Sequence, residues 1–180
     1  MKKRITMITL LDVDEMNKIN DLIKNIKEQI CKVPYGIDDE NRYKIDNLPF
    51  HFTIFATDKQ NESKMIELME QIKCNSVKVK VNQVKIRKGS KDSFVLYLSI
   101  EENENIKHLQ NIFYKELHSR HYNPDDFNFH MTLHIDTNYE RILLMQKIIN
   151  NNFKPFIIEF NRLGLFNYPG EIIKEINFTK

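Results

Sequence analysis

The sequence predicts an α+β fold in which duplicated strand and helix units form two pseudo-symmetric lobes. Antiparallel sheets are expected to line a central cleft, with helices outside. The first observation behind this prediction is a repeated tetrapeptide, His51-Phe52-Thr53-Ile54 and His130-Met131-Thr132-Leu133, whose copies lie 79 residues apart. Each copy alternates polar and apolar residues, as in a half-buried strand, so its His and Thr share one face about 6.6 Å apart.

The second observation is a repeated strand pattern at the same offset. Val77, Val79, Val81, Asn82, Val84 and Ile86 match Phe156, Ile158, Phe160, Asn161, Leu163 and Leu165 without a gap. In both copies the apolar alternation slips by one residue at the asparagine, which predicts a β-bulge there. The pattern indicates an internal duplication. Residues 1–180 are predicted to form one domain, with lobes of about 1–88 and 93–180 that exchange terminal strands.

The first half begins with an apolar strand over residues 5–11, followed by a helix capped by Asp12 or Asp14. The long connection over 32–49 is expected to cover substrate. The first motif strand over 50–57 and a helix over 62–73 come next. A strand over 77–86 then runs into the turn at 88–92.

The second half repeats this order with a strand over 94–100 and a helix over 105–119. After the second motif strand, Thr137 and Glu140 form a capping-box pattern for a helix that reaches about residue 150. Residues 156–166 and 172–178 are predicted to close the chain as a hairpin around the turn at 167–170.

Composition limits the kinds of partner. The net charge is only +2 at pH 7, so a polyanion is expected to be held in a local site rather than on a broad basic surface. The two cysteines, Cys31 and Cys74, have no zinc-site spacing, and four glycines supply no phosphate loop. No stretch approaches the roughly 20 apolar residues that span a bilayer. We expect a cytoplasmic monomer without a membrane partner.

The residue types of the two motifs suit phosphodiester chemistry. One histidine, His51 or His130, would remove a proton from the attacking oxygen while the other protonates the leaving oxygen. Thr53 and Thr132 would donate hydrogen bonds to the non-bridging oxygens as negative charge develops. This chemistry requires neither a metal nor another cofactor.

The tetrapeptides HFTI and HMTL resemble the paired signatures of the two-histidine phosphoesterase superfamily, which includes bacterial 2′-5′ RNA ligase-like proteins and cyclic phosphodiesterases. Both motifs match at every position, and the resemblance covers nearly the whole chain. It implies a metal-independent phosphodiesterase that acts on RNA or nucleotide substrates, with 2′,3′-cyclic phosphates or 2′-5′ linkages as the bonds attacked. His51, Thr53, His130 and Thr132 would be the catalytic residues.

Four further residues are candidates for substrate binding. Arg42 and Tyr43 in the long connection, and Tyr168 in the closing turn, could supply phosphate charge and base stacking. His134 is expected on the same strand face as His130 and Thr132. A solvated loop is the alternative for the first three, and a partly buried polar residue at a sheet edge is the alternative for His134.

Three alternative readings remain at this point. His118, His121, His130 and His134 would have zinc-like spacing if residues 128–135 were helical. The chain could also be a non-catalytic RNA- or nucleotide-binding protein that uses the same cleft. Finally, the motif histidines could be satisfied core residues, in which case replacing them would mainly lower stability.

Overall fold

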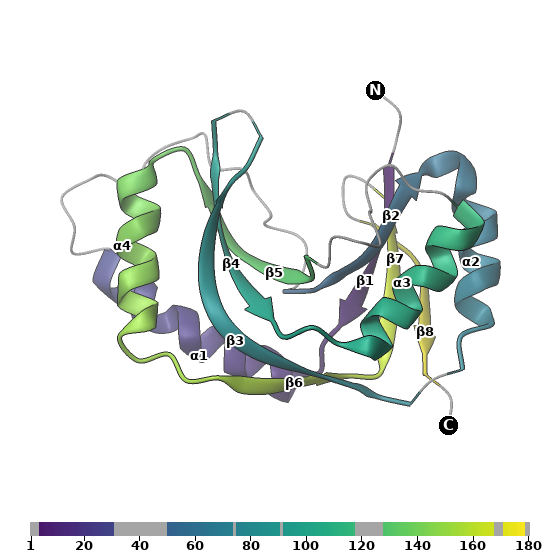
Figure 1. The fold of residues 1–180 in the computed structure, drawn as a ribbon, viewed down its shortest axis with the longest axis horizontal. Helices are drawn as coiled ribbons and strands as arrows, with labels where there is room; N and C mark the ends of the chain where they lie inside the picture. The colour runs from purple at the N-terminus through teal and green to yellow at the C-terminus, as the bar shows by residue number, and fades with distance from the viewer. Residues whose placement is uncertain are drawn as a thin grey trace.

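The computed structural model describes residues 4–30, 50–73, 75–90, 92–117, 128–167 and 171–178. In chain order the elements are β1 (Arg4–Leu10), α1 (Val13–Ile30), β2 (Thr53–Asp58), a 3₁₀ turn η1 (Lys59–Asn61), α2 (Glu62–Glu70), β3 (Val77–Lys88), β4 (Phe94–Ile100), α3 (Glu104–Leu117), β5 (His130–Asp136), α4 (Tyr139–Asn150), β6 (Phe156–Phe160), β7 (Arg162–Asn167) and β8 (Glu171–Asn177). The α+β prediction is confirmed (Figure 1).

The strands form two four-stranded antiparallel sheets, and each sheet takes strands from both halves of the sequence. One has the order β2-β1-β7-β8 and the other has the order β5-β4-β3-β6. Helix α4 packs against β3, β4 and β5, while α3 packs against β2. Figure 1 shows α4 and α1 outside the second sheet, and α2 and α3 outside the first.

An approximate twofold relation between the halves is visible in the strand register. Val79 pairs with Ile158 at the centre of the β3–β6 ladder, and Val77 and Val81 pair with Phe160 and Phe156 on either side. Val79 and Ile158 are equivalent positions of the 79-residue repeat. The repeat also converts the pair Val77–Phe160 into the pair Val81–Phe156. An isolated bridge between Phe52 and Met131 obeys the same relation. The axis that relates the lobes therefore passes between the two motifs.

Irregularities in the ladders also repeat. The bulge predicted in the first half is present, because the β3–β4 register shifts between Val81 and Gln83. The second half is interrupted at the matching Asn161, which separates β6 from β7. Two further shifts, at Ile54 in β2 and at Leu133 in β5, are again 79 residues apart. These shifts occur at equivalent positions of the two halves, so they are part of the repeated unit.

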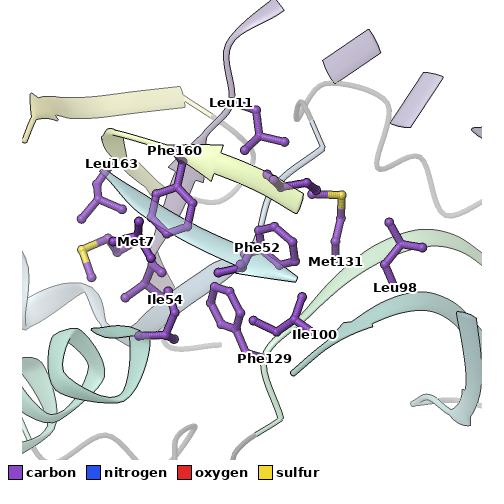
Figure 2. Packing of buried hydrophobic residues seen from close by; sticks show 14 of the residues in the cluster. Met7, Leu11, Phe52, Ile54, Leu98, Ile100, Phe129, Met131, Phe160 and Leu163 are labelled. Carbon is purple, nitrogen blue, oxygen red and sulfur yellow. The ribbon is translucent and has the colours of Figure 1, made fainter. Parts of the chain in front are cut away.

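The main hydrophobic core lies between the motif strands and the β3–β6 ladder. Phe52, Met131, Val79 and Ile158 are fully buried there. Phe52 stacks on Phe129 with ring centroids 4.8 Å apart, and Figure 2 shows these rings beside Met131. In each motif the apolar residue after the histidine, Phe52 or Met131, is thus packed in the core and fixes the motif strand.

Two predicted details differ from the structure. The N-cap of α4 is Asn138, whose side chain accepts a hydrogen bond from the Arg141 backbone N–H, so the prediction of a Thr137 cap is wrong by one residue. The predicted strand over 156–166 is two strands that join different sheets.

No helix within the described ranges is both long and apolar enough to cross a membrane. Cys31, Arg42, Tyr43, Cys74, His118, His121 and Tyr168 lie outside the described residues.

Candidate active site

The two motifs lie side by side, with their polar residues on one face. Phe52 and Met131 form an antiparallel bridge and are fully buried. Because successive side chains on extended backbone point to opposite faces, the residues on either side of this pair point away from the core. Those residues are the motif histidines and threonines, and all of them are half-buried. We call this side of the two motif strands, with its continuation across β4 and β3, the histidine face.

The bridge also sets the spacing within the histidine face. With Phe52 opposite Met131, His51 is next to Thr132, and Thr53 is next to His130. The two histidines are therefore diagonal neighbours, about 7–8 Å apart as is usual for such a pair, with a somewhat shorter Cβ–Cβ separation. They are close enough for His51 to lower the pKa of His130 electrostatically.

A buried threonine fixes the first motif strand to β1. The backbone N–H of Phe52 donates to Oγ1 of Thr9 at 3.0 Å, and the N–H of Thr9 donates to the carbonyl of Phe52 at 2.9 Å. Thr9 is fully buried, so its hydroxyl satisfies a backbone donor that water does not reach. These bonds fix the backbone at Phe52, the residue between His51 and Thr53.

His130 has defined partners on both ring nitrogens. Its Nδ1 lies 2.8 Å from the carbonyl oxygen of Asn128, and its Nε2 lies 2.9 Å from Nη2 of Arg87. The edge of the Tyr97 ring packs against the imidazole with centroids 5.2 Å apart. The Arg87 guanidinium also lies over the Tyr97 ring, 5.8 Å from its centroid. Strands β3, β4 and β5 each contribute one side chain to this cluster.

The partners of His130 determine its protonation state. A carbonyl oxygen only accepts hydrogen bonds and a guanidinium only donates them, so Nδ1 carries the proton and Nε2 presents its lone pair. This is a neutral imidazole. Burial lowers the pKa of His130, the hydrogen bond to Asn128 raises it, and the positive charge of Arg87 lowers it further. His130 is thus a proton acceptor near neutral pH.

The two motif threonines also belong to the histidine face. Neither Thr53 nor Thr132 forms a side-chain hydrogen bond to another residue in the described part of the chain. Thr132 pairs with Tyr97 across the β4–β5 ladder, and Thr53 pairs with Ile8 across the β1–β2 ladder. Each hydroxyl can therefore donate to a ligand held between the histidines.

The prediction that His134 shares a face with His130 and Thr132 is wrong. Thr132 pairs with Tyr97 whereas His134 pairs with Leu96, and adjacent residues of β4 point to opposite faces. The extra residue, Leu133, rotates His134 to the side covered by α4. There its Nε2 lies 3.6 Å from Oδ2 of Asp136, which also pairs with Arg141 of α4.

The zinc-site alternative requires residues 128–135 to be helical, and the structure does not meet this condition. Residues 130–136 form strand β5, not a helix, so His130 and His134 do not share a helical face. No cluster of three or more potential metal ligands occurs among the residues with described positions.

Arg87 and Tyr97 are site residues that the sequence reasoning missed. The bulge that the sequence predicts at Asn82 implies that Gln83, Lys85 and Arg87 share a face after the slip. What the sequence did not supply was the pairing that brings β3 and β4 beside β5. Lys85 pairs with Tyr97, which pairs with Thr132, so these three residues form a row across the histidine face.

Solved structures of other proteins share this fold, among them the following three. The chain aligns with LigT of E. coli complexed with phosphate (TM-score 0.59, 13% identity, 99% of each chain). It aligns with Usb1 of Kluyveromyces marxianus (TM-score 0.58, 14% identity, 98% of this chain and 99% of Usb1). It also aligns with a protein described as a phosphoesterase (TM-score 0.62, 13% identity, 99% of each chain). No protein-family model and no curated protein matches the sequence.

These alignments extend over essentially the whole chain, so they concern the complete arrangement of two lobes. At 12–14% identity they show a shared fold and carry no residue roles. The structural resemblance anticipated from the two motifs is confirmed at the level of the fold.

Proposed function

We propose that this chain, which has the fold of LigT and Usb1, is a two-histidine phosphoesterase that breaks phosphodiester bonds in RNA-like substrates without a metal. The proposal rests on one observation above all. The bridge between Phe52 and Met131 sets two His-x-Thr motifs next to each other, on one face and running in antiparallel directions. A phosphate between them has an imidazole on each side and a threonine hydroxyl beside each imidazole.

The reaction follows from this arrangement. One histidine accepts the proton of the attacking water as its oxygen bonds to phosphorus, and the other donates a proton to the oxygen whose bond to phosphorus breaks. In a 2′,3′-cyclic phosphate the leaving oxygen stays on the ribose, so the product is a phosphomonoester. Thr53 and Thr132 donate hydrogen bonds to the two non-bridging oxygens, where negative charge increases in the transition state.

The proposal also extends to the kind of phosphodiester that is attacked. The comparison structures include LigT with 3′-AMP and Usb1 with uridine monophosphate. A nucleotide phosphodiester is consistent with such ligands and with a site for one phosphate on a chain of low net charge. We propose 2′,3′-cyclic phosphates or 2′-5′ linkages as the bonds attacked.

The test is a hydrolysis assay on 2′,3′-cyclic nucleotides and on 2′-5′ and 3′-5′ dinucleotides, with products identified by the position of the phosphate. His51→Ala and His130→Ala should each lower turnover by about 10²–10⁴-fold, the usual contribution of a general acid or base. His108→Ala is a matched control, because His108 is an exposed histidine on α3. Near-normal turnover in either motif variant would refute the assignment.

A non-catalytic nucleotide-binding protein is the alternative that uses the same face. It predicts binding of nucleotide without product, and binding that survives replacement of one histidine. The neutral imidazole of His130 favours the enzyme, because a purely binding site for phosphate gains more from a protonated histidine than from a neutral one.

A further inference from the structure

We propose that Arg87 is the phosphate-binding cation of this site, which in the free protein holds His130 as a neutral base and on ligand binding donates its guanidinium to a non-bridging phosphate oxygen. The inference rests on the proposed function for its substrate, and on four features of the histidine face for its physical basis.

The first feature is the partner of Arg87. Its guanidinium contacts an imidazole nitrogen and the face of Tyr97, but no carboxylate among the described residues. The other cations of β3 with resolved partners face acids: Lys78 faces Glu159, Lys80 faces Glu101, and Lys88 faces Asp92. A guanidinium without a counter-charge, fixed beside a proposed catalytic histidine, has hydrogen-bond donors to offer to an anion.

The second feature is a second cation beside it. Lys85 lies two residues from Arg87 on the same face and is exposed, with no ion pair to a described residue. Lys85 and Tyr97 are directly opposite each other, and Tyr97 is opposite Thr132. Positive charge therefore increases from the threonine toward β3, on the side of the site next to His130.

The third feature is that the equivalent positions of the sheet β2-β1-β7-β8 carry no such charge. At the 79-residue offset, Gly164 stands for Lys85 and Phe166 stands for Arg87. Ile8 takes the place of Tyr97, since it pairs with both Gly164 and Thr53. Ile8 and Phe166 belong to a small buried apolar cluster with Leu10. At these equivalent positions the described part of the site is thus basic beside His130 and apolar beside Thr53, so its two sides offer different surroundings to the substituents of a bound phosphate.

The fourth feature is the contact between Arg87 and Nε2 of His130, which distinguishes the roles of the two histidines. Arg87 donates to the Nε2 lone pair of His130, which must become available before that nitrogen can accept a proton. A phosphate oxygen is a stronger acceptor for a guanidinium than a neutral imidazole is. Binding of the ligand would therefore free Nε2 at the same time as it neutralises Arg87. His130 then takes the proton of the attacking water, and His51 gives a proton to the leaving oxygen.

The experiment compares Arg87→Met, Arg87→Lys and the control Lys88→Met, which removes a positive charge from the next residue of the same strand. Histidine-labelled protein is titrated with inorganic phosphate and followed by ¹⁵N NMR, with His130→Gln to assign the signals. In the wild type, His130 should show a protonated Nδ1 and an unprotonated Nε2, and phosphate should shift the Nε2 signal. Arg87→Met should bind phosphate about 10- to 100-fold more weakly, the loss expected for a hydrogen bond to a charged group.

Arg87→Lys should recover part of the affinity, because it keeps the charge but loses the planar donor pair. In Arg87→Met the pH at which His130 becomes protonated should rise, and the acidic limb of kcat/KM should move to higher pH with it. Phosphate affinity in Arg87→Met within twofold of the wild type, or an equal loss in Lys88→Met, would overturn the inference. If the wild type hydrolyses no phosphodiester while Arg87→Met still loses phosphate affinity, the proposed function fails and the role of Arg87 in binding stands.

Discussion

Val79 of β3 lies directly opposite Ile158 of β6, and the two residues are equivalent positions of the repeat. The same relation holds for Phe52 and Met131 in the motifs. Both pairs lie on the approximate twofold axis and both are completely buried. The buried contacts along this axis therefore include one in the core, between Val79 and Ile158, and one directly beneath the motif histidines, between Phe52 and Met131.

Phe52→Ala should destabilise the protein by about 3–5 kcal/mol, the usual cost of removing a buried phenyl ring. The ring is fully buried and stacks on Phe129, so its loss leaves a cavity beneath the first motif. Chemical denaturation measures the change. Phe52→Leu, which keeps most of the volume, should cost clearly less, and an equal loss in both variants would contradict the packing argument.

Thr9→Val should cost about 1–3 kcal/mol, because it leaves the buried N–H of Phe52 without an acceptor while keeping the side-chain shape. Thr9→Ser retains the hydroxyl and is the matched variant. We expect its unfolding free energy to stay nearer to that of the wild type. The hydrogen bond is unimportant if the two variants unfold at the same denaturant concentration.

Thr53→Val and Thr132→Val should each reduce kcat by about 10²–10³-fold, the effect usual for loss of one donor to a developing oxyanion. Both side chains are half-buried and nearly isosteric with valine, so unfolding should change little. The serine variants should keep most of the activity. Steady-state kinetics on a 2′,3′-cyclic nucleotide provides the measurement, and valine variants with wild-type kcat would exclude the proposed role.

The lowered pKa of His130 should make folding stability depend on pH in a defined direction. Since the unfolded histidine titrates near 6.5, it binds a proton more readily than the folded one as pH falls below that value. The free energy of unfolding should therefore decrease from about pH 6.5 down to the lowered pKa, and become level below it. Denaturation of wild type and His130→Gln across this range tests the effect, which should be smaller in the variant.

Hydrolysis should continue in excess chelator. Two histidines carry out both proton transfers in the proposed reaction, and the threonines and Arg87 supply the electrostatic stabilisation. The assay compares turnover before and after dialysis against EDTA, with metal analysis of the protein. Loss of activity that is restored by one divalent ion would contradict the metal-independent mechanism.

The repeat made much of this fold predictable from the sequence. The order of elements and the bulge near Asn82 follow from the matched patterns. The direct bridge between the two motifs at Phe52 and Met131 does not, because the repeat alone predicts only that they line one central cleft. The shifts at Ile54 and Leu133 were not foreseen, because apolar residues occupy both sides of these strands and hide the change of face. For that reason His134 was assigned to the wrong side.

The asymmetry of the site could not be predicted from the motifs, which are identical in type. It arises from residues on β3 and β4 whose position depends on long-range pairing, and Arg87 reaches His130 from 43 positions away. The repeat alignment does hold a usable signal, since Phe166 replaces Arg87 at the offset. Differences between otherwise matching halves show where the two lobes have diverged.

Strand exchange between the halves has a consequence for the origin of the protein. Since β7 lies between β1 and β8, and β3 lies between β4 and β6, neither half completes a sheet from its own strands. A separate half would leave backbone edges open for pairing with another chain. A chain of half this length would therefore need a second copy of itself to complete its sheets, with one His-x-Thr motif in each copy. Fusion of two such copies allows one histidine to acquire an arginine neighbour without the other.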